Sequence, residues 1–179
     1  MSKFSAKRYH DISCGHRVTG HESKCRHLHG HNYRVHFTCV ALKEGILDLL
    51  DPDLNLGSAI HANGVDSLGR VIDFSVIKER LCMWIENNWD HKFLAWENDS
   101  IMESIYTALM NHIPPSDTIV ESCDIISESI VWTPFNPTAE NMAQYLVEVV
   151  GPLQLEGTGV VLTEVLVEET SKCHASYSL

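Results

Sequence analysis

The hydrophobic and polar positions alternate along the first forty residues, which is the pattern of half-buried β-strands. In residues 31–42 one face is apolar and the other is polar. The apolar face consists of Tyr33, Val35, Phe37, Cys39 and Ala41, and the polar face of Asn32, Arg34, His36 and Thr38. The stretch HDISCGHRV, residues 10–18, also alternates. We therefore expect two strands in this part of the chain.

Two later segments have apolar residues at helical spacing. Residues 73–89, DFSVIKERLCMWIENNW, predict a helix that begins near Asp73. Its apolar side is Phe74, Ile77, Leu81, Trp84 and Ile85. The stretch NPTAENMAQYLVEVV predicts a second helix, with Asn136 as its N-cap and Pro137 at its first helical position. Its apolar stripe is Met142, Tyr145, Leu146 and Val149.

The remaining segments differ in how clearly their pattern can be interpreted. Residues 45–69 are turn-rich and predict a long connection, while residues 159–179 predict a strand. Residues 95–133 are ambiguous: 100–113 suit an extra helix and 127–133 a strand. Strands followed by helices mixed with strands predict an α+β fold with an antiparallel sheet.

Composition narrows the class of protein. A chain of 179 residues with 44% hydrophobic and 21% charged residues suits one globular domain. No apolar run approaches the roughly 18 residues of a membrane span. The start, MSKFSAKRYHDIS, has no apolar signal core, so we expect a cytoplasmic protein with no membrane partner, whose six cysteines are reduced thiols.

The charge is distributed unevenly. The net charge is −11, yet residues 1–43 carry eight Lys and Arg against two acidic residues. The remainder has five basic against 22 acidic residues. An acidic body argues against nucleic-acid binding. The basic front could still hold a small anion, or could simply be a solvated edge.

The densest chemistry is in CGHRVTGHESKCRHLHGHNY, residues 14–33, which holds five histidines and two cysteines. His29 and His31 are two residues apart on a predicted strand, so their side chains share a face. Gly30 between them allows close backbone approach. His16, at the end of the other alternating stretch, is the best candidate for a third ligand. Three histidines and one open position form the pattern of catalytic zinc.

Cys25 lies four residues before His29 and allows two interpretations. It could be a fourth ligand, which would close a structural zinc site. It could instead be a reactive thiol, since Lys24, Arg26 and a metal ion all favour the thiolate. The sequence pattern alone leaves both open.

Two further positions, each with a carboxylate, are candidates for site residues. Asp90 and His91 are adjacent in WDHKFL, and a carboxylate beside an imidazole can act as an acid–base pair. Glu169 ends a strand face whose other members are Val161, Thr163, Val165 and Val167, opposite the face of Leu162, Glu164, Leu166 and Glu168. A carboxylate there needs a donor: water, an Arg, or the N–H edge of an aminopyrimidinone ring.

Together these motifs resemble the 6-pyruvoyltetrahydropterin synthase / 6-carboxytetrahydropterin synthase family. The matching pieces run through nearly the whole chain: the histidine of SCGHRV, then CRHLHGHNY, GRVIDFSVIK, WDHKFL, NPTAENMAQYL and LVEETSKCHASY. The spacing C-x3-H-G-H is similar to that of the bacterial 6-carboxytetrahydropterin synthase branch of queuosine biosynthesis. The biopterin branch has a longer gap, and the folate branch has Glu where this chain has Leu28.

The resemblance implies a role for each candidate. His16, His29 and His31 would bind Zn²⁺, Cys25 would abstract protons, and Asp90 and His91 would relay them. Glu169 would anchor the pterin ring, and Thr138 would add a pterin contact. The basic front, especially around Lys24, Arg26 and His27, could hold a triphosphate against the acidic remainder of the chain.

The resemblance also implies an assembly and a reaction. The fold would be the tunnelling fold, an antiparallel four-stranded sheet with two helices on one face. Three subunits would close a barrel and two trimers a homohexamer, with sites at subunit interfaces, so that Asp90, His91 or Glu169 could serve a neighbour. Residues 1–179 would form one such domain, with insertions near 45–69 and 95–133.

The substrate would be 7,8-dihydroneopterin triphosphate, and the products 6-carboxy-5,6,7,8-tetrahydropterin, acetaldehyde and triphosphate. The alternatives are the pyruvoyl-forming reaction, which eliminates triphosphate without breaking the carbon chain, and a non-enzymatic protein with structural zinc.

Overall fold

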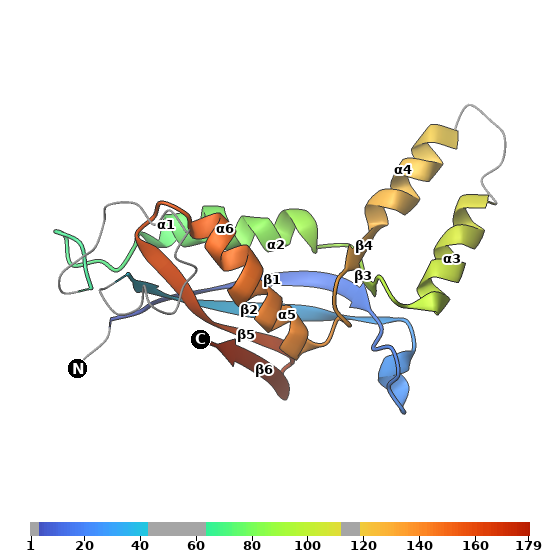
Figure 1. The fold of residues 1–179 in the computed structure, drawn as a ribbon, viewed down its shortest axis with the longest axis horizontal. Helices are drawn as coiled ribbons and strands as arrows, with labels where there is room; N and C mark the ends of the chain where they lie inside the picture. The colour runs from blue at the N-terminus through green and yellow to red at the C-terminus, as the bar shows by residue number, and fades with distance from the viewer. Residues whose placement is uncertain (1–3, 43–63, 112–118) are drawn as a thin grey trace.

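A computed structural model describes residues 4–42, 64–111 and 119–179 of the chain. Its centre is a six-stranded sheet in the order β4-β3-β1-β2-β5-β6 (Figure 1). The strands are β1 (Ala6–His16), β2 (His29–Ala41), β3 (Phe93–Trp96), β4 (Ile130–Thr133), β5 (Val160–Thr170) and β6 (Cys173–Ser178). None of the helices in the described ranges has the length and apolar character to cross a bilayer. Of the connection expected at 45–69, residues 45–63 lie outside the described residues.

The fold is α+β as expected, but its sheet contains both parallel and antiparallel strand pairs and is not purely antiparallel. β1, β2, β5 and β6 form antiparallel pairs, whereas β3 pairs parallel with β1 and β4 parallel with β3. Parallel neighbours require a crossover connection. Helices α3 (Ser100–Asn111) and α4 (Ile119–Ser129) lie between β3 and β4 and project from the sheet as an arm (Figure 1). The expectation of four strands was therefore wrong, because residues 93–133 extend the sheet beyond β1.

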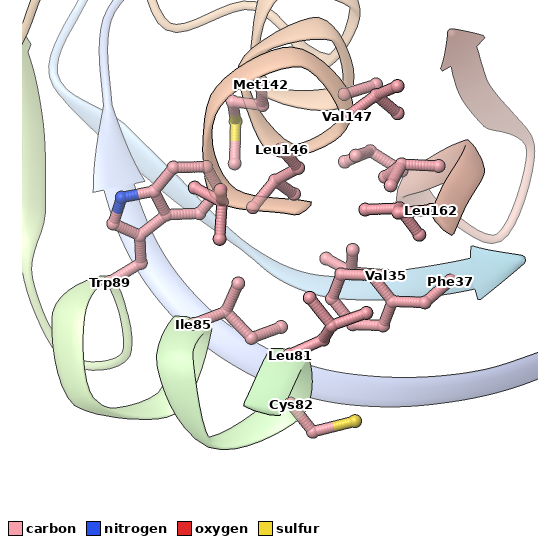
Figure 2. Close-up of a cluster of buried hydrophobic side chains, with 14 of the residues drawn as sticks. Val35, Phe37, Leu81, Cys82, Ile85, Trp89, Met142, Leu146, Val147 and Leu162 are labelled. Atoms are coloured by element: carbon pink, nitrogen blue, oxygen red, sulfur yellow. The ribbon is translucent and has the colours of Figure 1, made fainter. Parts of the chain in front are cut away.

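Two helical segments cover one face of the sheet, as expected. The first is α1 (Phe74–Ile77), a wider π-helical turn (Lys78–Cys82) and α2 (Met83–Asn88). The second is α5 (Ala139–Tyr145), a π-helical turn (Leu146–Val150) and α6 (Gly151–Leu155). Both pack onto the sheet face of Val35 and Phe37 and form the core (Figure 2). Asp73 caps the first segment as predicted, with its carboxylate accepting from Ser75 N, but Phe74 is exposed.

The second helical segment begins two residues later than predicted. Its N-cap is Thr138, whose hydroxyl accepts from Asn141 N, and its first helical residue is Ala139. Asn136 cannot cap this helix because its amide pairs with the backbone of Thr19 on both sides, at 3.0 and 2.9 Å. Met142 and Leu146 are buried as predicted, while Val149 is not.

The C-terminal segment folds as a hairpin and not as one strand. Thr170 Oγ1 accepts from the backbone N–H groups of Lys172 and Cys173, which closes the turn between β5 and β6. An irregularity in the pairing of β2 with β5 also shifts the face of β5: Thr38 pairs with Glu164, but the next residue of β2 pairs with Leu162. Upstream of this bulge Val160 and Leu162 belong to the main core cluster, whereas Val161, although buried, and Thr163 do not. Val165 and Val167 face the core as predicted.

Candidate metal centre and active site

Three histidines meet at the end of β1 and the start of β2. The antiparallel register places His16 directly opposite His29, and His31 is two residues further along the same strand. The ring centroids are 4.4 Å apart for His16 and His29, 5.3 Å for His16 and His31, and 5.0 Å for His29 and His31. One nitrogen from each ring lies within 4.8 Å of the others. The structure thus brings together the three ligands that the sequence suggested, in a group that could hold a metal ion.

Hydrogen bonds select the nitrogen that two of these rings present. His16 Nδ1 lies 2.7 Å from the carbonyl of Pro137, and His29 Nδ1 lies 2.8 Å from the carbonyl of His27. A carbonyl oxygen only accepts, so each Nδ1 carries the proton and each Nε2 keeps its lone pair. Such a partner on the far nitrogen is the usual arrangement around a metal-binding imidazole.

The surroundings also favour neutral rings. Burial lowers the pKa of His16, against the opposing effect of the Pro137 hydrogen bond. Burial likewise lowers the pKa of His31, although the charge of Glu169 opposes it. Neutral imidazole is the form that binds a metal ion.

Tyr33 belongs to the site, although the sequence indicated only a core position. Its side chain is 1% exposed, and its hydroxyl donates to His16 Nε2 at 3.0 Å. Burial raises the pKa of Tyr33 well above its usual range, and the negative charge of Glu169 adds to the effect. The sequence does contain one indication of this role: Tyr33 is two residues after His31, so the two side chains lie on the same face of the strand.

Glu169 lies beside two of the three histidines of its own chain. Its Oε1 is 3.6 Å from His16 Nε2 and 3.6 Å from His31 Nε2. The strand pairing accounts for this position. Glu168 of β5 pairs with Arg34 of β2, and Glu169 is the next residue along β5. The carboxylate is therefore next to the nitrogens that would face a metal ion.

Cys25, Thr138 and Glu169 line one cavity of about 260 Å³. Cys25 is half-buried in a short 3-10 helix, Lys24–Arg26, and its thiol is free. It is not part of the three-histidine ligand group. His21, which the sequence did not single out, lines the same cavity. Three of the predicted site residues thus line one cavity, and one of them, Glu169, also lies beside His16 and His31.

The Asp90–His91 pair is formed, and His91 borders a second hollow that His29 and His31 also line. His91 Nδ1 lies 2.6 Å from Asp90 Oδ2, and Asp90 Oδ1 accepts from Ser13 N at 2.7 Å. Burial alone would raise the pKa of Asp90, but hydrogen bonds from Ser13 N and His91 outweigh it and lower the pKa. His91 has a left-handed backbone, with φ of 56°, and its side chain is 83% exposed.

No hydrogen bond or ion pair within the described ranges joins this pair to Cys25 or to the three histidines. His91 and Lys92 border an open hollow of about 730 Å³, where Gly15 and Gly30 pair across β1 and β2. A Cβ on Gly30 would lie 2.9 Å from the carbonyl oxygen of Cys14, so only glycine fits there without a shift. Ser13 and Asn32, which also line this hollow, alternate with buried residues and so face away from the helices.

Comparison with known proteins identifies the family. The model of the family described as 6-pyruvoyl tetrahydropterin synthase matches residues 5–179. The chain belongs to this family. Among curated relatives, 6-carboxy-5,6,7,8-tetrahydropterin synthase of Rickettsia felis is 30% identical over 163 residues, covering 91% of each chain. The protein of the same name from Haemophilus influenzae is 22% identical over 143 residues, 80% of this chain and 79% of its own.

Solved structures agree with the fold. An uncharacterised protein from Wolinella succinogenes superposes with a TM-score of 0.71 at 21% identity, covering 99% of both chains. The 6-pyruvoyl tetrahydropterin synthase of Caenorhabditis elegans superposes with a TM-score of 0.54 at 19% identity, covering 100% of this chain and 97% of its own. At such identities the likeness concerns the fold alone. The family resemblance expected from the motifs is therefore confirmed.

Proposed function

We propose that this member of the family converts 7,8-dihydroneopterin triphosphate to 6-carboxy-5,6,7,8-tetrahydropterin, releasing acetaldehyde and triphosphate, in queuosine biosynthesis. The observation that carries the proposal is the meeting of His16, His29 and His31 beside a cavity lined by Cys25 and Glu169. The names of the curated relatives and the C-x3-H-G-H spacing support the carboxy-forming reaction over its pyruvoyl-forming counterpart.

The donor set suits Zn²⁺. Two of the rings have Nδ1 bound to carbonyls, which leaves neutral Nε2 atoms for a cation that prefers nitrogen ligands in tetrahedral geometry. Three protein ligands leave one coordination position for a substrate oxygen. A zinc ion bound there supplies Lewis-acid polarisation of that oxygen.

The side chains of the protein have the remaining roles in the reaction. Cys25 abstracts and returns protons on the substrate side chain, since its free thiol lines the cavity. Glu169 accepts hydrogen bonds from the amino-pyrimidinone edge of the pterin, a bidentate arrangement that also fixes the orientation of the ring. Thr138 adds a contact in the cavity, and the basic front of the chain, which includes Lys24, Arg26 and His27, holds the triphosphate.

Asp90 and His91 relay protons in the site of a neighbouring subunit. Among the described residues no hydrogen bond or ion pair joins the pair to its own chain's Cys25. His91 borders the hollow at Gly15 and Gly30, which His29 and His31 also line. The assembly would be a homohexamer of two trimers, each trimer closing its sheets into a barrel. Residues 1–179 form one domain, and segments 45–69 and 95–133 are insertions in it.

The decisive test is the product spectrum of the zinc-loaded protein with dihydroneopterin triphosphate. We expect acetaldehyde and triphosphate in equal amounts, together with the carboxy product. A pyruvoyl product without acetaldehyde would instead assign the sister reaction.

A second experiment separates catalytic from structural zinc. Cys25→Ala should keep about one zinc per chain while turnover falls by about 10²-fold or more, because the ligands remain and the base is lost. Cys173→Ala, which removes another thiol lining the same cavity, is the matched control and should keep turnover. Joint loss of zinc and folding in Cys25→Ala would indicate a structural site.

A further inference from the structure

The loop that carries Cys25 is held by hydrogen bonds to the residues at which the loop starts. Val18 N donates to the carbonyl of Cys25 at 2.8 Å, and Arg17 Nε donates to the carbonyl of Arg26 at 2.9 Å. Arg17 and Val18 directly follow β1, which ends at the ligand His16. The position of the thiol therefore depends on where Arg17 and its neighbours are held.

Asp99 holds this part of the chain. Arg17 Nη1 lies 2.5 Å from each carboxylate oxygen of Asp99, and Thr19 Oγ1 donates to Asp99 Oδ2 at 2.7 Å. The carboxylate also accepts from the N–H groups of Ile101 and Met102, so it caps the start of α3. Asp99 is 1% exposed and Arg17 is 7% exposed. Two charged side chains are thus buried in one hydrogen-bonded cluster at the base of the α3–α4 arm.

Such a cluster is an inefficient way to gain stability. Removing two charges from water has a large cost, and well-packed apolar side chains often stabilise a protein equally well. A buried ion pair does fix geometry, because each carboxylate oxygen of Asp99 must stay oriented toward its hydrogen-bond donors. In this chain the geometry that it fixes is that of the Cys25 loop.

We propose that Asp99 is a positioning residue for the Cys25 thiol, acting through Arg17 and Thr19. The inference rests on the proposed function, in which Cys25 acts on the substrate. It assigns a role to the start of the 95–133 segment: this segment supplies the buried anchor of the catalytic loop.

The test uses Thr19→Val and Asp99→Asn in the full chain. Thr19→Val removes only the hydroxyl that bonds Asp99, and Thr19→Ser retains it. Asp99→Asn keeps the size of the side chain but removes its charge. Thr158→Val is the matched control, because the Thr158 hydroxyl also makes one internal bond, to the Leu155 carbonyl, outside the site.

Three quantities are measured for each variant: kcat and KM with dihydroneopterin triphosphate, zinc per chain, and the rate of Cys25 alkylation by iodoacetamide, mapped by peptide mass spectrometry. We expect kcat to fall about 10-fold in Thr19→Val and about 100-fold in Asp99→Asn, since small misplacements of a reacting group have effects of this size. KM and zinc content should change less than about 3-fold. Cys25 alkylation should accelerate as the half-buried thiol is released.

A structural role alone predicts a different result. Thr19→Val would then match Thr158→Val in kcat and in Cys25 alkylation, and this would overturn the inference even if Asp99→Asn does not fold. Recovery of wild-type kcat in Thr19→Ser would support it. Turnover that survives Cys25→Ala would remove the proposed function of Cys25 as well, whereas turnover that needs Cys25 but ignores Thr19→Val would remove only the positioning role.

Discussion

Two backbone carbonyls, those of Pro137 and His27, determine the chemistry that His16 and His29 can offer. By accepting from Nδ1 they leave the lone pair of each ring on Nε2, and in His16 this Nε2 accepts from the Tyr33 hydroxyl. The spacing of HGH was sufficient to predict that His29 and His31 share a face, because strand periodicity is local. The partner of His16 was not predictable, since Pro137 is 121 residues away in sequence.

The first prediction concerns the metal. His29→Ala should reduce bound zinc from about one per chain to nearly none, because two remaining imidazoles hold the ion far more weakly. His27→Ala is the control: it removes a neighbouring side chain but keeps the backbone carbonyl that His29 uses. Inductively coupled plasma mass spectrometry after dialysis measures the metal content. Stoichiometric zinc in His29→Ala would contradict the ligand set.

The second prediction concerns acid. Burial alone would raise the pKa of Asp99, but bonds from Thr19 and from the Met102 and Ile101 N–H groups, with the Arg17 charge, lower it below its usual value. The folded state therefore binds fewer protons than the unfolded chain near pH 4. The stability from Asp99 is present above that pH and is lost as the pH falls through the lowered pKa.

Urea denaturation at pH 7 and at pH 3 tests this sign. Asp99→Asn should lower the free energy of unfolding at pH 7 by about 3 kcal/mol, because the Arg17 charge stays buried without its partner. The difference from wild type should shrink at pH 3. A difference that stays constant with pH would show that the Asp99 charge contributes nothing to the effect.

The helices that cover the sheet are each interrupted by a wider turn. In the second segment, Leu146–Val150 is π-helical and has more residues per turn than an α-helix. This changes which residue faces the core after Leu146. Val150 is 2% exposed, while Val149, which regular α-helical spacing places on the apolar stripe, is 40% exposed. Periodicity alone assumes a constant 3.6 residues per turn, so it could not detect the change.

A pair of substitutions measures this shift. Val150→Ala should lower the free energy of unfolding by about 2 kcal/mol, since it removes buried methyl groups and leaves a cavity. Val149→Ala should change it by less than about 0.5 kcal/mol, as expected for a surface position. Chemical denaturation of both variants under the same conditions provides the comparison. Equal losses would mean that the helix keeps its regular spacing.

The other elements show the same division between local and non-local causes. The alternation of β1 and β2 and the cap at Asp73 were predictable because each depends on nearby residues. The segment that holds the strand Ile130–Thr133 was ambiguous in the sequence. The bulge at Thr163 was not predictable, because it exists only in the pairing of β5 with β2. The Asn136 cap failed for a similar reason: a distant partner, Thr19, uses its amide.

At the scale of the molecule, Cys25 and His91 line two different hollows. Cys25 and Glu169 line one cavity, whereas His91 borders the hollow at Gly15 and Gly30, which His29 and His31 also line. The sequence motifs predicted both residues, but motifs do not contain the distance between them. A single chain in which Cys25 and His91 line different hollows is consistent with a site completed by a second copy.

Mixing of inactive variants tests this arrangement. Cys25→Ala and His91→Ala chains are unfolded together at equal amounts and reassembled with zinc. If the two residues come from different subunits, about a quarter of the interfaces regain both, and activity returns to about that fraction of wild type. Cys25→Ala mixed with Glu169→Ala is the control, because both residues line one cavity of one chain, so no mixed interface restores them. Recovery in neither mixture would place His91 in the cavity of its own chain, and equal recovery in both would place Glu169 in the neighbour's site.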